Sequence, residues 1–168
     1  CPMKSYRMRG RVTERPDSLA HYPVILQNLL LARGLSEPAH IEQFLNPDYE
    51  SGLHDPFLLN DMDKAVDRIL FAIESKENIL IYSDYDADGI PGGVMLKEFF
   101  DKIGYVQVEN YIPHRHDEGY GLHLDAVESF LPKDIKLIIT VDCGIVDVDQ
   151  VARAQELGMD VIITDHHE

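Results

Sequence analysis

The chain has 168 residues, of which 45% are hydrophobic and 27% are charged. This composition is typical of a folded globular domain and excludes a disordered or fibrous chain. No apolar run approaches the ~18 residues that span a bilayer, and the first thirty residues lack the pattern of an export signal. The two cysteines, Cys1 and Cys143, fit a reducing compartment. We therefore expect a cytoplasmic protein with no membrane partner.

The charge of the chain is strongly negative and unevenly distributed. Thirty acidic and fifteen basic residues give a net charge of −15, which opposes nonspecific binding to a polyanion. Five basic residues nevertheless lie within the first fifteen positions, where Glu14 is the only acid: Lys4, Arg7, Arg9, Arg11 and Arg15. We expect a basic arm followed by an acidic body.

The first part of the chain is predicted to be helical. An extended leader is expected up to about residue 20. Apolar residues at helical spacing then predict helices over 22–33, 37–45 and 61–75. A polar stretch that contains prolines, 46–56, separates the second helix from the third, and no element is predicted there.

From residue 78 the pattern changes to short β-branched runs that alternate with helical ones. The predicted elements are strands at 79–82, 106–112, 137–141 and 161–164, and helices at 92–103, 123–130 and 147–157. This alternation is typical of a parallel sheet with crossover helices. The expected fold class is therefore α/β, an open and mainly parallel sheet preceded by a helical N-terminal region. The expected domains are 1–77 and 78–168.

Three of the four predicted strands are followed by aspartate. Asp84, Asp86 and Asp88 follow the first strand, Asp142 follows the third, and Asp165 follows the fourth. In an open parallel sheet the carboxyl ends of the strands form one edge, where ligands bind. We therefore expect these acids, far apart in the sequence, to converge at one rim.

The segment Ser83–Gly89 places acids at every second position, so in an extended chain they would point the same way. Three adjacent carboxylates repel one another unless a cation holds them, which indicates a hard ion such as Mg²⁺ or Mn²⁺. A surface turn is the alternative. An EF-hand calcium loop is not supported, because Met95 stands at the twelfth position from Asp84. Gly92 and Gly93 would let a backbone or a phosphate approach the start of the next helix.

The ends of the third and fourth strands each have a functional and a structural interpretation. Asp142 is a metal ligand or an ordinary strand-end residue, and Cys143 is expected to be buried rather than nucleophilic. His166 and His167 add two imidazoles beside Asp165, which favours a metal or catalytic site. The isolated histidines are expected to be structural: His21, His40, His54 and His123.

The segment 113–121 follows the second strand and contains Arg115 and two glycines, Gly119 and Gly121. The planar guanidinium of Arg115 is suited to binding a phosphate, and the glycines permit a close backbone approach. An ordinary polar loop is the alternative.

Four motifs stand in the order Ser83–Gly89, Glu118–Gly121, Val141–Gly144 and Thr164–His167. Together they resemble the DHH phosphoesterase superfamily, and most closely its RecJ-type single-strand-specific exonucleases. The helical region also resembles the N-terminal part of that group, at residues 33–35, 44–47 and 54–59. The likeness extends over nearly all of the chain.

The resemblance implies a centre of two ions, Mn²⁺ or Mg²⁺, that hydrolyses single-stranded DNA from 5′ to 3′ in repair and recombination. The implied metal ligands are Asp84, Asp86, Asp88, Asp142 and His166. Asp142 would bridge both ions, His167 would face the scissile phosphate, and Asp165 would orient the histidines.

Two features depart from the family pattern. Pro91 stands where such proteins often have a small hydroxyl residue, and the chain stops one residue after His167, where family members continue with another metal-binding aspartate and a second domain. We therefore expect an N-terminal fragment, truncated at its C-terminal end, with little activity and with the missing domain as a partner. The alternatives are a DHH phosphodiesterase of short oligonucleotides or cyclic dinucleotides, and an inactive scaffold of the same fold.

Overall fold

The computed structural model describes residues 16–167, and the chain divides between Leu58 and Leu59 into two compact units. The basic arm expected in the first fifteen residues lies outside the described part. No helix within the described residues is long and apolar enough to cross a membrane.

The first unit is helical, as the apolar spacing predicted. Its elements are η1 (Asp17–Leu19), α1 (Val24–Leu31), α2 (Pro38–Leu45), α3 (Tyr49–Gly52) and η2 (Pro56–Leu58). Leu19, Leu30 and Ile41 form its small buried core. The short helix α3 lies in the polar stretch for which no element was predicted. Asp48 begins it, because its carboxylate accepts a hydrogen bond from Ser51 N–H at 2.8 Å.

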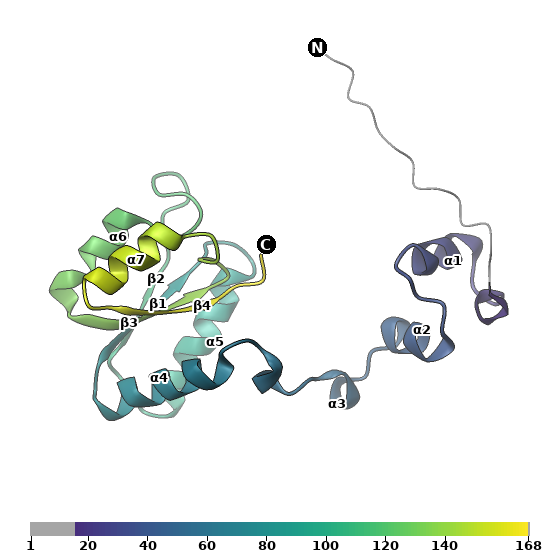
Figure 1. Ribbon diagram of the computed structural model, residues 1–168, viewed down its shortest axis with the longest axis horizontal. Helices are drawn as coiled ribbons and strands as arrows, with labels where there is room; N and C mark the ends of the chain where they lie inside the picture. The colour runs from purple at the N-terminus through teal and green to yellow at the C-terminus, as the bar shows by residue number, and fades with distance from the viewer. Residues whose placement is uncertain (1–15, 168) are drawn as a thin grey trace, which may run out of the picture. The chain divides into compact units, whose positions relative to one another are not determined.

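The second unit is the α/β sheet that the alternating pattern predicted (Figure 1). Its helices and strands are α4 (Met62–Glu74), β1 (Asn78–Ser83), α5 (Gly89–Lys102), β2 (Val108–Tyr111), α6 (Leu124–Ser129), η3 (Leu131–Lys133), β3 (Ile135–Val141), α7 (Val148–Glu156) and β4 (Asp160–Thr164). All three strand pairings are parallel, and the strand order is β2-β1-β3-β4. Gly104 and Gly158, with φ of 76° and 82°, end the helices α5 and α7 where left-handed backbone is needed.

Helices cover both faces of the sheet (Figure 1). Because side chains alternate along a strand, β1 sends Leu80 and Tyr82 to one face and Ile79 and Ile81 to the other. The first face packs against α6 and α7, and the second packs against α4 and α5. This burial on both faces explains why the strands read as continuous apolar runs.

The unit that contains the sheet begins before residue 78, the predicted domain boundary. Helix α4 belongs to this unit, because Ala72 is fully buried with Ile79 and Phe100 in the same core. The helix is amphipathic, and that pattern predicted a helix without predicting which partner its apolar face would contact.

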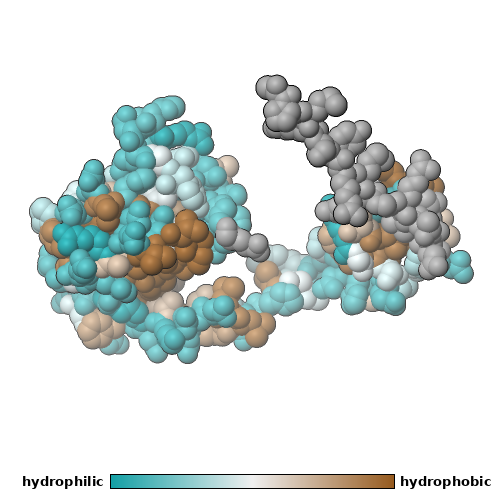
Figure 2. Space-filling model, turned by 45° about the horizontal axis from the view of Figure 1, so that its top comes forward, coloured by the Kyte–Doolittle hydropathy of each residue, from teal (hydrophilic) through white to brown (hydrophobic). Residues whose placement is uncertain are grey.

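The surface of the sheet unit also exposes apolar side chains, and Figure 2 shows a patch of them on one face. A hollow of about 250 Å³ lies between α7 and the edge strand β4, where Ile145, Val148 and Ile163 are exposed. These side chains lie outside the two cores.

Candidate metal centre at the carboxyl ends of the strands

Parallel pairing brings three aspartates side by side. Ser83 pairs with Val141, and Val141 pairs with Thr164. The pattern continues one residue further, since Asp84 N–H donates to the Val141 carbonyl at 3.0 Å and Asp142 N–H donates to the Thr164 carbonyl at 2.9 Å. The expected convergence at one rim is therefore observed.

The first cluster of candidate ligands consists of Asp84, Asp86 and Asp142. One carboxylate oxygen from each lies within 4.8 Å of the others. Asp84 is only 3% exposed, and its buried Oδ1 has no hydrogen-bond partner in the described structure. A buried charged oxygen without a donor is unfavourable, so this position is suited to a cation.

The second cluster consists of Asp142, His166 and His167, whose candidate ligand atoms also lie within 4.8 Å of one another. His166 Nε2 is 3.0 Å from Asp142 Oδ1. Asp142 thus belongs to both clusters. Its φ of 63° is left-handed, a conformation that aspartate and asparagine adopt more readily than most residues, and it places the side chain at the turn after β3.

The third acid of the first motif, Asp88, lies outside both clusters. The expected alignment of three alternating acids is not observed, because the chain bends and turns at residues 85–88 instead of staying extended. Asp86 makes this turn: its Oδ1 accepts hydrogen bonds from Asp88 N–H at 2.9 Å and Gly89 N–H at 3.1 Å. These two donors lower the pKa of Asp86.

The two carboxylates that face each other have opposite pKa shifts. Burial raises the pKa of Asp142, and the nearby Asp86 carboxylate raises it further, against the effect of His166. With the pKa of Asp86 lowered and that of Asp142 raised, the ionised pair is electrostatically unfavourable. A bound cation would relieve this repulsion.

The two adjacent histidines have different partners. Whereas His166 contacts Asp142, His167 Nδ1 lies 2.6 Å from Asp165 Oδ1. Asp165 has a 1% exposed side chain and also accepts from Ile145 N–H and His167 N–H, each at 3.1 Å. Burial opposes ionisation of Asp165, but these donors outweigh it and lower its pKa. The hydrogen bond with Asp165 raises the pKa of His167.

The glycines at the start of α5 allow close packing of the helix on the sheet. A Cβ at Gly93 would lie 2.0 Å from Ser83 Oγ, and one at Gly92 would lie 2.7 Å from Val141 Cγ1. Gly89 is equally constrained, because its Cβ would lie 2.5 Å from the Asp84 carbonyl oxygen. Helix–strand contact therefore requires small residues at positions 92 and 93, and the phosphate contact expected at these glycines stays a prediction.

Arg115 lies in the loop between β2 and α6, with its guanidinium 4.5 Å from the ring centroid of Tyr85. The charge of Arg115 helps to lower the pKa of Asp86, after the two backbone donors. Glu118 closes this loop by accepting from Tyr111 Oη–H and His114 N–H, each at 2.6 Å. The loop thus has defined internal contacts, and it places the positive charge of Arg115 near the rim.

Sequence reasoning missed Tyr120 as a residue of this site. Its hydroxyl is 3.0 Å from His167 Nδ1 and 3.3 Å from the Asp142 carbonyl oxygen, to which it donates. Burial raises the pKa of Tyr120 to about 12, and Asp165 contributes, so the hydroxyl keeps its proton at neutral pH. Tyr120 lies in the motif Glu118–Gly121, so the resemblance could have indicated this residue, but the motif alone assigned it no role.

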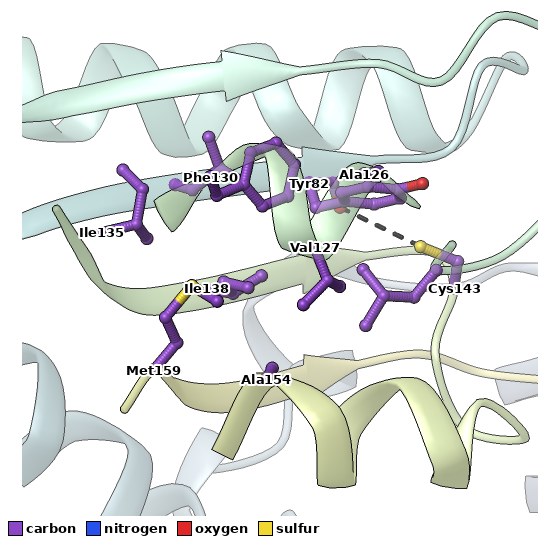
Figure 3. Close-up of a cluster of buried hydrophobic side chains, with 11 residues drawn as sticks. Tyr82, Ala126, Val127, Phe130, Ile135, Ile138, Cys143, Ala154 and Met159 are labelled. Atoms are coloured by element: carbon purple, nitrogen blue, oxygen red, sulfur yellow. Dashed lines mark hydrogen bonds between the residues drawn. The ribbon is translucent and has the colours of Figure 1, made fainter. Parts of the chain in front are cut away.

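Cys143 is buried, as expected, and takes no part in the rim. It is 0% exposed, and its Sγ lies 3.9 Å from the Tyr82 carbonyl oxygen in the core beneath α6 (Figure 3). Burial raises the pKa of this thiol to about 12. A protonated, enclosed thiol is not a nucleophile at neutral pH.

The donor set fits a divalent cation. Carboxylate oxygens and an imidazole are ligands that suit Mn²⁺ and, for the oxygens, Mg²⁺. In addition, no lysine or arginine of the described residues forms an ion pair with Asp84, Asp86 or Asp142. The cluster therefore has the charge and the chemistry of a metal site.

Comparison with known families agrees with this fold. Residues 78–168 match the model of the DHH family, N-terminal domain, and this match begins at the predicted start of the sheet region. The chain belongs to the DHH family. Its relatives are of the RecJ type. The single-stranded-DNA-specific exonuclease RecJ of Bacillus subtilis is 40% identical, over 99% of this chain and 22% of its own length. The RecJ of Escherichia coli is 30% identical, over 95% of this chain and 27% of its own length.

Solved structures show the same likeness. A crystal structure of exonuclease RecJ bound to manganese superposes with a TM-score of 0.61 and 35% identity, covering 66% of this chain and 28% of that protein. RecJ from Thermus thermophilus in complex with Mn²⁺ has a TM-score of 0.60 and 27% identity, covering 83% of this chain and 18% of that protein. The chain spans about a quarter of the length of these relatives.

Proposed function

We propose that this chain provides the metal-binding centre of an exonuclease that hydrolyses phosphodiester bonds of single-stranded DNA. The observation that supports the proposal is the pair of overlapping clusters at one rim of the sheet, which share Asp142 and include the unpaired buried oxygen of Asp84. The names of the RecJ relatives supply the substrate class.

Asp84, Asp86, Asp142 and His166 would hold the ions, and Asp142, which belongs to both clusters, would contribute to each site. Asp88 stays a predicted ligand, although it lies outside both clusters. When bound, two divalent ions activate water at neutral pH and neutralise the charge that develops on the phosphate. The Mn²⁺ of the solved relatives favours manganese, and Mg²⁺ remains compatible with the same ligands.

The remaining residues of the rim would bind and orient the substrate. His167 has its Nδ1 side engaged by Asp165, so Nε2 is the nitrogen left to face the phosphate and to hold or transfer a proton. Arg115 would contact a phosphate through its guanidinium, supported from behind by the Tyr85 ring. The N-terminus of α5, with Gly92 and Gly93 in its first turns, would add backbone N–H dipoles.

The likeness to the RecJ relatives also suggests the wider role that we propose for this chain. It comprises 5′ to 3′ cleavage, a function in DNA repair and recombination, a cytoplasmic location, and a C-terminal domain as a partner in holding the strand. The net charge of −15 is compatible with binding DNA, because carboxylates concentrated around cations attract phosphate through those cations.

The proposal is tested by incubating the chain with Mn²⁺ and single-stranded DNA and measuring the release of 5′ mononucleotides. We expect slow release that is abolished in Asp142→Asn and unchanged in Asp149→Asn, an exposed aspartate outside both clusters. Hydrolysis confined to dinucleotides or cyclic dinucleotides would instead support a phosphodiesterase of short substrates. Equal rates in the wild type and Asp142→Asn would contradict the proposal.

A further inference from the structure

The loop that contains Arg115 contacts the rim of the sheet through Tyr120 as well as through the Arg115–Tyr85 pair. The hydroxyl of Tyr120 reaches two elements at once: it donates to the Asp142 carbonyl at the end of β3 and lies 3.0 Å from His167 Nδ1 beyond the end of β4. The two rings also meet edge to face, with centroids 5.6 Å apart. Tyr120 thus spans the rim between two candidate ligand segments.

The hydrogen-bond directions at this point are mutually consistent. His167 Nδ1 lies 2.6 Å from Asp165 Oδ1 and 3.0 Å from Tyr120 Oη, so its N–H is shared between a carboxylate and a hydroxyl oxygen. The hydroxyl proton of Tyr120 is then free to go to the Asp142 carbonyl. Two acceptors on one side of the imidazole fix its tautomer and leave Nε2 unprotonated in the neutral ring.

We propose that Tyr120 is a positioning residue that orients His167 for the reaction and joins this histidine to the phosphate-binding loop of Arg115. The inference rests on the proposed function for its catalytic consequence. Asp165 contacts the imidazole at Nδ1, and the Tyr120 hydroxyl adds a second contact at the same nitrogen, from the end of another loop. The contact between Tyr120 and His167 also fixes the end of the loop that precedes α6. The start of the loop is fixed by Glu118, through its hydrogen bonds with Tyr111 and His114.

The position of Tyr120 in the chain supports this role. Gly119 and Gly121 flank it with φ of 87° and 92°, so the backbone turns on both sides of the tyrosine. The turn after it is fixed, since Asp147 Oδ2 accepts from Leu122 N–H at 2.7 Å and Tyr82 Oη–H donates to the Gly121 carbonyl at 2.9 Å. A tyrosine held from a rigid turn presents its hydroxyl at a defined place.

The test uses Tyr120→Phe, which removes the hydroxyl and keeps the ring. The matched control is Tyr105→Phe, because Tyr105 also donates to backbone carbonyls, at Ala72 and Glu77, before β1 and away from the rim. Two quantities are measured in each variant: the ¹⁵N chemical shifts of the His167 ring in the metal-free chain at one fixed pH, and the kcat and KM of Mn²⁺-dependent release of mononucleotides from single-stranded DNA.

We expect Tyr120→Phe to shift the His167 ring signals and to lower kcat by about 10-fold or more, as for other groups that orient a site residue, with KM changed by less than about two-fold. Tyr105→Phe is expected to lower the thermal midpoint alone. Unchanged ring signals in Tyr120→Phe, an unchanged kcat, or an equal loss of kcat in Tyr105→Phe would overturn the inference. If the wild type hydrolyses nothing, the proposed function fails, and the ring signals decide whether the contact orients His167.

Discussion

Carboxylates gather at both ends of the same sheet, and the two groups differ in what neutralises them. At the amino ends of the strands, Glu77 and Asp160 are paired with Arg68, at 2.8 and 2.6 Å. At the carboxyl ends, Asp84 and Asp142 are buried without a lysine or arginine partner among the described residues. The first group is compensated by an arginine of the fold, whereas the second has no such cation among the described residues.

The comparison shows how a structural acidic cluster is distinguished from a functional one. An ion pair compensates its carboxylates within the fold, and removal of one partner leaves the other uncompensated. A metal site keeps its carboxylates together without such a partner. At Asp142, burial raises the pKa first, and the nearby Asp86 carboxylate raises it further.

The largest effect is expected for Asp142→Asn, because this residue belongs to both clusters. Loss of an outer partner of a metal site costs about 10–100-fold in affinity, so loss of a shared ligand is expected to weaken Mn²⁺ binding by more than about 100-fold. Calorimetric titration measures this. Asparagine tolerates the left-handed φ of this position, so the fold is kept, and Asp149→Asn is the matched control. Equal affinities for Mn²⁺ in Asp142→Asn and the wild type would show that the acids at the carboxyl ends of the strands are not a metal site.

At the opposite end, Arg68→Gln is expected to lower stability and to leave Mn²⁺ binding unchanged. The side chains of Arg68 and Glu77 are 21% and 18% exposed, so the loss lies below that of a fully buried pair, at about 1–3 kcal/mol. Urea unfolding measures it. Lys64→Gln breaks the exposed pair with Asp61 and is expected to leave the midpoint unchanged. Weaker metal binding in Arg68→Gln would show that the two ends are not independent.

An intermediate effect is expected for Arg115→Ala, since Arg115 is a cation near the rim that stacks on Tyr85 instead of pairing with a carboxylate. We expect the affinity for a 5′-phosphorylated oligonucleotide to fall about 10-fold, equivalent to about 1.4 kcal/mol. Fluorescence anisotropy measures this. The control is Arg153→Ala, which removes an equal charge on α7. An equal loss of oligonucleotide affinity in Arg153→Ala would show that only the net charge of the chain matters.

The smallest effect concerns Glu118, a carboxylate stabilised mainly by hydrogen-bond donors, with smaller contributions from the charges of His123 and His114. Burial opposes its ionisation, but Tyr111 and the His114 N–H outweigh it and lower its pKa. A lowered folded-state pKa gives stability that is present above the unfolded value and is lost as pH falls below about 4.5. Glu118→Gln is expected to lose less than about 1 kcal/mol at neutral pH and to flatten this acidic part of the stability curve. An unchanged curve would show that the donors have no net effect.

The sequence predicted the elements of the sheet unit well, because periodicity and glycine caps act locally. The strands β1, β3 and β4 lie within about two residues of their predicted bounds, and β2 is shorter than the predicted 106–112. Convergence of Asp84, Asp142 and Asp165 also followed from one topological rule. It required only that the strands be parallel.

The remaining features depended on contacts that no local pattern contains. Asp88 lies outside the clusters, because the Asp86 carboxylate turns the chain immediately after β1. Gly93 is needed for packing against Ser83, a neighbour in space that alternation could not identify. Tyr120 acquires its contacts only when the loop folds over the ends of β3 and β4. The elements and the meeting of the strand ends were thus predictable from the sequence, whereas these individual side-chain contacts were not.

The central claim is that the unpaired carboxylates of the rim hold divalent cations. Its most direct test is a crystal of this chain grown with Mn²⁺, in which anomalous diffraction locates the metal. We expect anomalous peaks in contact with Asp142 and with Asp84, Asp86 or His166, and their loss in Asp142→Asn. A chain that binds no Mn²⁺ at this rim, or binds it only elsewhere, would contradict the claim.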